Sequence, residues 1–276
     1  AEMLNRTAGG RTFKQVVGYK NLEELNELLL KFSSRVLKKD CLDLPDKIYM
    51  TRNIEMTPEQ EKAYKEIKAY AITQLYDEEK GGQHVSATSV FTKMLRLHQL
   101  SCGFMTTDDK ENMEVKSKRL DELMNILEEV EGKAIIWANY RHDIHRILEA
   151  IRKTYGEDSV GAYYGDVNDF DRGLYLKQFQ DLKSPLRFMV GNTQTGGYGI
   201  NLTAASTVIY YSNNFDLEKR LQSEDRAHRI GQVNKVTYID IVCKDTVDEK
   251  IVKSLLAKQN IAAEVLGEEK WKDWIR

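Results

Sequence analysis

The C-terminal part of the chain alternates short apolar runs, rich in β-branched residues, with longer segments whose apolar residues recur at helical spacing. Such alternation is typical of βαβ units, so it predicts a parallel sheet flanked by helices. The expected strands lie at residues 133–138, 159–163, 186–191, 207–211 and 235–242.

The segments between these strands are predicted to be amphipathic helices. In residues 141–154, for example, apolar residues from Ile144 to Ile151 fall on one face and charged residues on the other. The expected helices span residues 117–129, 141–154, 168–179, 216–229 and 246–266. A last helix is expected to carry Trp271 and Trp274, most simply as residues that dock it.

Polar residues at the starts of three of these helices predict their caps. Asn168 and Asp216 precede helical patterns, and both residue types are favoured at the N-cap. Thr246 and Glu249 have capping-box spacing, in which the two side chains satisfy free backbone amides reciprocally.

The first 130 residues have a different pattern, which predicts mostly helix and one strand-like stretch at residues 47–56. Proline suits the first turn of a helix, so Thr57-Pro58 is expected to start one that runs to about residue 76. The sequence DEEKGGQHVS at residues 77–86 predicts a flexible break, and residues 106–116 a second polar loop.

Composition narrows the class of protein. Charged residues nearly cancel, to a net charge of -2, so any contact with nucleic acid must be a local patch. The longest apolar runs fall far short of the roughly 20 residues that span a bilayer. Cys41, Cys102 and Cys243 show no CxxC spacing, which argues against a disulfide framework or a zinc site. We therefore expect an intracellular location without a membrane segment, and the start AEMLN suggests excision from a longer protein.

The segment QSEDRAHRIGQ at residues 222–232 sets Arg226 and Arg229 three residues apart. On a helix that spacing places both guanidiniums on one face, where they can reach a single polyphosphate. Gly231 would then let the chain leave the helix. The alternative from the residues alone is an exposed helix with ordinary surface charges.

A glycine-rich loop precedes that segment, within residues 190–212. Gly196, Gly197 and Gly199 allow the backbone to approach a ligand and to aim amides at a phosphate, while Thr193 and Thr195 add hydroxyl donors. Nowhere does the chain contain a Walker lysine loop or a DEAD-type acidic box. It therefore cannot supply the usual magnesium and triphosphate cradle by itself.

These motifs together resemble those of the Swi/Snf-type helicase-like ATPases of superfamily two. TGGYGINLTAASTVIYY, QSEDRAHRIGQ and VTYIDIVCKDTVDEKI are similar, in order and spacing, to the region of motifs V and VI. The resemblance extends upstream to KAIIWANY as motif IV, and to SKRLDEL, YYGDVNDFDR, QEKAY and SSRVLKKDCLDLPDKIY. Nearly the whole chain is covered.

The resemblance implies an α/β fold, a RecA-like parallel sheet flanked by helices, with a helical N-terminal extension. Residues 1–45 would be the end of the first motor lobe and the linker, and residues 46–276 the second lobe. Within that lobe we expect a helical entry region at 46–130, the sheet core at 131–245 and C-terminal brace helices at 246–276. ATP would lie between the lobes, with magnesium held by the missing first lobe, and the partner would be a DNA duplex.

Site residues are implied in the same way, position by position. Arg226 and Arg229 would reach the β and γ phosphates as arginine fingers, and Gln222 would help to place them. Gly197 and Gly199 would lie near the nucleotide. Contacts with the DNA backbone would come from Asn139, Gly165, Asp166 and Thr193. Backbone contacts suit an enzyme that moves along any sequence.

Other readings remain open at this stage. The leading interpretation is the second motor lobe of an ATP-dependent double-stranded DNA translocase. The alternatives are a non-catalytic nucleic-acid or protein binding module that keeps the motor-lobe fold, and a strand-separating helicase. His142 and His145 share a helix but lack a third ligand, so we assign no metal to this chain. His228 is expected to pack or hydrogen-bond within its motif, and Trp137 to lie in the core. The absence of a large insertion suggests a bacterial or phage protein of the cytoplasm.

Overall fold

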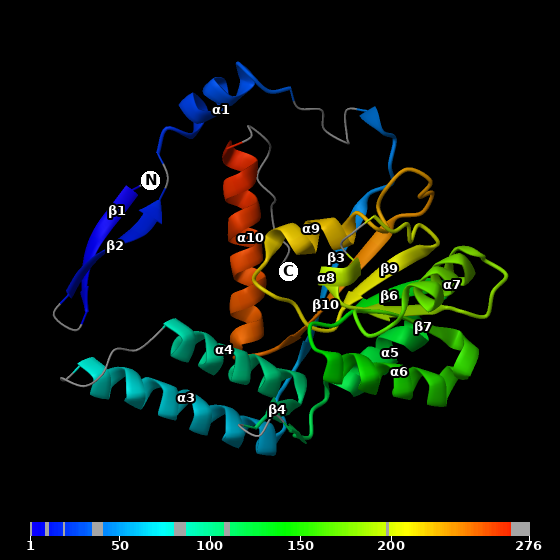
Figure 1. The fold of residues 1–276 in the computed structure, drawn as a ribbon, viewed down its shortest axis with the longest axis horizontal. Coiled ribbons are helices and arrows are strands. Elements are labelled where there is room, and N and C mark those ends of the chain that lie inside the picture. The colour runs from blue at the N-terminus through cyan, green and yellow to red at the C-terminus, as the bar shows by residue number, and fades with distance from the viewer. Residues whose placement is uncertain are drawn as a thin grey trace.

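A six-stranded parallel sheet forms the centre of the molecule, in the order β3-β10-β9-β6-β8-β7 (Figure 1). The computed structural model describes residues 2–8, 11–18, 20–34, 41–79, 87–107, 111–196 and 199–265. The strands are β3 (Lys47–Ile54), β6 (Lys133–Trp137), β7 (Val160–Tyr163), β8 (Phe188–Gly191), β9 (Ala205–Tyr210) and β10 (Val236–Cys243). The parallel sheet and its predicted strands are confirmed, each within a few residues.

Both faces of β6, β7 and β8 are buried, which explains why these strands are continuous apolar runs. Alternate side chains of β6 enter two separate cores, because successive residues of a strand point to opposite faces. Ala134 and Ile136 pack against α5 (Arg119–Glu129) and α6 (Arg141–Tyr155), whereas Ile135 and Trp137 pack with Phe179 and Ala227 on the other face. Trp137 has no exposed surface and is a core residue, as expected.

The predicted helices form, with differences at their ends. In α7 (Asp169–Gln180), Asn168 caps the helix by accepting from the Asp171 amide at 2.9 Å. Asp216 likewise caps α9 (Leu217–Glu224) through the Lys219 amide at 3.2 Å. This helix ends at Glu224, five residues before the predicted end.

The start of α10 (Val247–Val265) modifies the expected capping box. The Thr246 hydroxyl accepts from the Asp248 amide at 3.2 Å, but the Glu249 carboxylate accepts from the Asp245 amide rather than from Thr246. Both side chains still satisfy free amides at the helix start. Trp271 and Trp274 lie outside the described residues.

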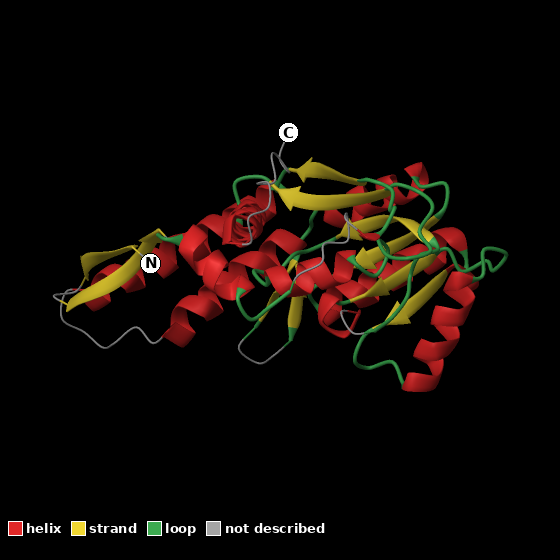
Figure 2. Ribbon diagram, turned by 90° about the horizontal axis from the view of Figure 1, so that it is seen from above, coloured by secondary structure: helices red, strands yellow, loops and turns green. Residues whose placement is uncertain are grey.

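The N-terminal part contains more β-structure than predicted. β1 (Glu2–Ala8) and β2 (Arg11–Gly18) form an antiparallel hairpin that stands apart from the large sheet (Figures 1 and 2). It is followed by α1 (Leu22–Leu30), α3 (Pro58–Glu79) and α4 (Ala87–Cys102). β4 (Phe104–Thr106) pairs with β5 (Asn112–Glu114) inside the expected polar loop.

Two expectations about this part are therefore corrected. The strand at residues 47–56 is not the single one before residue 130, and β3 is an edge strand of the large sheet. The sheet core thus includes a strand from outside residues 131–245. α3 continues to Glu79, beyond the expected break at 77, and residues 80–86 lie outside the described part.

Candidate functional site

The candidate DNA-contacting residues lie at the carboxyl edge of the sheet. Asn139 follows β6, Gly165 and Asp166 follow β7, and Thr193 follows β8. These three strands are neighbours and run in parallel, so their following loops share one edge. Gly165 and Asp166 are exposed, and Asp166 forms an ion pair with Arg141 at 3.1 Å. In open α/β sheets this edge is where ligands bind.

The glycine-rich loop leaves this edge through a short helix, α8 (Thr193–Gly196), which Asn192 supports by accepting from the Thr195 amide at 2.8 Å. Gly199 has φ +68, a left-handed conformation that favours glycine, and a Cβ placed there would meet nothing within 4 Å. The backbone at Gly199 is therefore open to an incoming group. Gly197 lies outside the described residues.

Arg226 and Arg229 lie on the segment after α9, residues 225–231, here named the arginine turn. Nη1 of Arg229 donates to the Ile200 carbonyl at 3.2 Å, and Nη1 of Arg226 lies 3.5 Å from the same oxygen. The Leu202 amide donates to the Arg226 carbonyl at 3.0 Å. The glycine-rich loop and the arginine turn are thus held together, and both guanidiniums converge on one point next to Gly199.

The reason for this convergence differs from the expected one. The pair was expected on one face of a helix, but α9 ends at Glu224 and the arginine turn is irregular. Gly231 adopts φ +98 and lets the chain turn toward β10, although the helix has ended earlier. Both guanidiniums nevertheless approach the same acceptor, the Ile200 carbonyl.

The arginine turn places two positive charges close together. Partial burial lowers the pKa of Arg226 and the neighbouring Arg229 lowers it further, whereas the Asp225 carboxylate acts in the opposite direction. The Ile200 carbonyl that both guanidiniums approach is neutral. Gln222 is less well placed than expected, because its amide donates to Glu218 on the same helix at 2.8 Å.

Behind the arginine turn, buried polar side chains fix its two ends. The Glu224 carboxylate has no exposed surface and accepts from Lys47 at 2.9 Å, Tyr49 at 2.8 Å and Arg220 at 3.0 Å. Burial opposes its charge, but Lys47 and Arg220 outweigh that cost and lower the pKa of Glu224. Gln232 donates its amide toward the carbonyls of Thr203, Ala205 and Ala227.

His228 bonds within this arrangement, as expected. Its Nε2 donates to the Pro45 carbonyl at 2.7 Å, which joins the arginine turn to the chain that leads into β3. His142 and His145 contact different groups: His142 stacks near Phe104, and His145 bonds to the Tyr164 hydroxyl at 2.9 Å.

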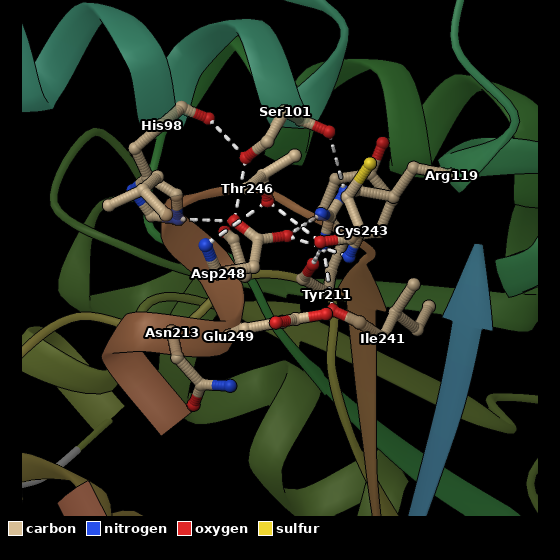
Figure 3. Close-up of polar contacts among 12 residues, drawn as sticks. His98, Ser101, Arg119, Tyr211, Asn213, Ile241, Cys243, Thr246, Asp248 and Glu249 are labelled. Carbon is tan, nitrogen blue, oxygen red and sulfur yellow. Dashed lines mark hydrogen bonds and ion pairs between the residues drawn. The ribbon is translucent and has the colours of Figure 1, made fainter. Parts of the chain in front are cut away.

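A second buried cluster joins several elements around Arg119 (Figure 3). Arg119 has no exposed surface, donates to the carbonyls of Ser101, Tyr211 and Ile241, and forms an ion pair with Asp248. Burial opposes its charge, but the Asp248 carboxylate outweighs this and raises the pKa of Arg119. The cluster connects α4, α5, β9, β10 and α10.

Sequence reasoning missed the residues that support the site. Arg119 was placed on a helix and Lys47 at the start of a strand, but neither was recognised as buried or part-buried. Their partners are distant: 129 residues separate Arg119 from Asp248, and 177 separate Lys47 from Glu224. The only signal for Arg119 and Lys47 in the sequence was that both lie in segments that resemble family motifs.

Two family models match successive parts of this chain. The SNF2-related domain matches residues 8–104, and the Helicase conserved C-terminal domain matches residues 115–231, which include the carboxyl edge and the arginine turn. Together the two matches support a Swi/Snf-type helicase-like ATPase of superfamily two. The RecA-like fold that the resemblance implied is confirmed.

A curated relative agrees with this assignment. A putative ATP-dependent helicase/translocase of Bacillus subtilis is 27% identical over 91% of this chain and 28% of its own length. The chain spans about a quarter of the length of the curated relatives that it matches.

Solved structures resemble the chain over most of its length. The Sulfolobus solfataricus SWI2/SNF2 ATPase core in complex with double-stranded DNA is 26% identical, covering 87% of this chain and 50% of that one, with a TM-score of 0.60. The C-terminal part of the Fun30 ATPase domain has the same fold, with a TM-score of 0.63 at 20% identity over 77% of this chain and 90% of that one.

In the part of the chain that the structure describes, we find no helix with the length and apolar character of a membrane span.

Proposed function

We propose that this chain is the second motor lobe of an ATP-dependent double-stranded DNA translocase, and that it supplies an arginine pair to an ATP site completed by another lobe. The observation that carries the proposal is the convergence of Arg226 and Arg229 on the Ile200 carbonyl, beside the open backbone of Gly199. Two adjacent, part-exposed guanidiniums on a neutral acceptor form a site suited to a polyphosphate.

The chemistry fits that role. Phosphoryl transfer needs positioning and charge stabilisation more than covalent help, and an arginine finger is worth roughly 10³ to 10⁵ in rate. ATP bound at the arginine pair would add negative charge where two positive charges now stand side by side. The lysine loop, the acidic box and the magnesium would belong to the first lobe, because the 276 residues contain neither motif.

The arrangement of the chain supports a division between residues 45 and 46. β3 begins at Lys47 and is the edge strand of the RecA-like sheet, so the second lobe starts no later than this strand. Residues 1–45, with the separate β1–β2 hairpin, would be the end of the first lobe and the linker. We expect the whole protein to work inside the cell.

DNA is the proposed partner of the carboxyl edge. Asn139, Gly165, Asp166 and Thr193 would contact the backbone of one strand, with Thr193 donating to a phosphate. The resemblance to an ATPase core solved with double-stranded DNA supports this partner. Asp166 and Arg141 form an exposed ion pair there, so a DNA phosphate would compete with Asp166 for Arg141.

The direct test is Arg229→Ala in the complete polypeptide. DNA-stimulated ATP hydrolysis should fall by at least about 1000-fold, because the variant removes charge stabilisation in the transition state. DNA binding should stay within about twofold, since Arg229 is not among the residues proposed to contact DNA. Arg152→Ala on α6, which removes an ion pair with Glu157, is the matched control and should hydrolyse ATP normally. Unchanged hydrolysis in Arg229→Ala would refute the proposed role.

A further inference from the structure

The segment that leads into β3, residues 44–49, contacts the arginine turn and the end of α9 directly. The Pro45 carbonyl accepts from Nε2 of His228 at 2.7 Å. Lys47 Nζ lies 2.9 Å from the Glu224 carboxylate and 3.9 Å from that of Asp225, and the Tyr49 hydroxyl donates to Glu224 at 2.8 Å. We call residues 44–49 the entry segment.

The residues that the entry segment contacts lie close to both arginines in the sequence. Glu224 lies two residues before Arg226, and His228 lies immediately before Arg229. The arginine turn is a series of turns and bends rather than a regular helix or strand. The Glu224 carbonyl accepts from the amides of Ala227 at 3.2 Å and His228 at 3.1 Å, so the position of Glu224 also sets the path of the backbone that follows. Glu224 is fully buried and ion-paired, which makes it a rigid anchor for the first of the two arginines.

Between the two anchors, the arginine turn also bonds to the rest of the lobe. The Arg226 carbonyl accepts from Leu202, and Gln232 reaches three carbonyls near the start of β9. The entry segment differs from these partners because it is the point where the chain passes from the proposed first lobe into the second. A change in the angle between the lobes would act on this segment first.

We propose that the entry segment positions the arginine pair, with Lys47 acting through Glu224 and the Pro45 carbonyl acting through His228. Lys47 and His228 are positioning residues, since neither would touch ATP. The inference rests on the proposed function and adds a coupling to it: the orientation of the first lobe sets where Arg226 and Arg229 point. Hydrolysis would then be fast only when the linker holds the closed geometry.

The size of the expected effect follows from the geometry that arginine fingers require. A misplacement of about 1 Å at a reacting group costs roughly 100-fold in rate. Because the arginines would act mainly on charge that develops in the transition state, loosening them should lower kcat while leaving KM for ATP nearly unchanged. A residue that served only to stabilise the fold would lower the unfolding temperature without this selective loss of kcat.

The experiment compares variants of the complete polypeptide at saturating DNA. Lys47→Met keeps the apolar stem of the side chain and removes the charge that faces Glu224, and Lys47→Arg restores it. His228→Ala removes the donor to Pro45, and His228→Gln replaces it with an amide donor. Lys235→Met is the matched control, because Lys235 pairs with Asp46 at 3.0 Å next to Lys47 but both partners are exposed.

We expect kcat to fall about 10- to 100-fold in Lys47→Met and in His228→Ala, with KM for ATP changed less than twofold. Lys47→Arg and His228→Gln should recover at least a third of the wild-type kcat, and Lys235→Met should match wild type. The variants of Lys47 and those of His228 are independent tests. If Lys47→Met does not fold, the His228 variants decide, and if His228→Ala does not fold, the Lys47 variants decide. Thermal unfolding identifies such a variant.

Three results would overturn the inference while Arg229→Ala still abolishes hydrolysis. These are a kcat within twofold of wild type in both Lys47→Met and His228→Ala, an equal fall in Lys235→Met, or failure of both conservative variants to recover activity. If Arg229→Ala itself leaves hydrolysis intact, the proposed function is refuted instead. The two failures are therefore distinguishable.

Discussion

Two pairs of arginines in this lobe have opposite surroundings. Arg119 and Arg220 are buried, and each forms an ion pair with a buried carboxylate, Asp248 for Arg119 and Asp240 for Arg220. Arg226 and Arg229 are part-exposed, and their guanidiniums approach the neutral Ile200 carbonyl. The first pair faces buried carboxylates inside the protein, whereas the second lies at the surface, with Asp225 as a nearby carboxylate.

This contrast separates structural from functional charge within one fold. Ionised groups are costly to bury unless a partner and hydrogen bonds offset the cost, so Arg119 and Arg220 are expected to hold elements together. For Arg226, burial and the like charge of Arg229 lower its pKa more than the opposing effects of Asp225 and Tyr163 raise it, so its surroundings disfavour the positive charge. An external polyphosphate is the partner that would offset it.

The largest difference between the two pairs should appear in stability. Arg119→Met leaves Asp248 buried without its main counter-charge, so the free energy of unfolding should fall by about 3–5 kcal/mol. Arg229→Ala should change it by no more than about 0.5 kcal/mol, because it removes one of two neighbouring like charges. Urea unfolding, followed by the fluorescence of buried Trp137, measures both. If both variants lost the same free energy of unfolding, the distinction between structural and functional arginines would be wrong.

A smaller effect concerns Asp143, a fully buried carboxyl near Arg119. Burial raises the pKa of Asp143 to about 7, although Arg119 and Arg146 act in the opposite direction. The native state therefore holds a proton that the unfolded state loses near pH 4, so this group's contribution to stability falls as pH rises from about 4 to 7. Burial lowers the pKa of His98 to about 4, which gives the opposite trend between pH 4 and 6.5.

Asp143→Asn should reveal the second trend by removing the first. Relative to wild type, the variant should gain about 2–3 kcal/mol of stability between pH 5 and pH 7.5, at 1.36 kcal/mol per pKa unit. Urea unfolding at several pH values tests this. If the difference in stability between variant and wild type did not change with pH, Asp143 would be ionised in the native state, stabilised by the nearby charge of Arg119.

The smallest expected effect lies at the carboxyl edge. Thr193→Val keeps the shape of the side chain and removes the hydroxyl proposed to meet a DNA phosphate, so affinity for duplex DNA should fall about fivefold, or roughly 1 kcal/mol. The salt dependence of binding should be preserved, because no charge is lost. Thr237→Val, near the amino end of β10, is the matched control. An equal loss in both variants would argue against a phosphate contact at Thr193.

Local pattern was enough to predict the sheet because each buried parallel strand is an apolar run, as in β6 and β8. The end of α9 was not predictable in this way. Residues 225–229 continue a helical pattern, but Glu224 is held by Lys47, which lies 177 residues away in the sequence. The β1–β2 hairpin was missed although Gly9-Gly10 separates two β-rich runs, which is a hairpin signal.

The motifs indicated which residues to combine into a candidate site but not how they are arranged, and the roles of these residues stay predictions. The motifs pointed to Arg226, Arg229 and Gly199, and the structure brings these together around Ile200. Gln222 is directed along its own helix instead. The sequence alone does not distinguish a buried arginine such as Arg119 from a surface arginine, because its burial depends on partners that are distant in the sequence.

The most direct test of the central claim, that the arginine pair is half of a composite site, is a comparison of ATP hydrolysis by residues 1–276 and by the complete polypeptide, each with saturating duplex DNA. The complete polypeptide should hydrolyse ATP at an ordinary enzyme rate, roughly 1–100 per second. The 276-residue chain should be at least about 1000-fold slower, because it lacks the lysine loop and acidic box. Hydrolysis by this chain alone at a comparable rate would contradict the account.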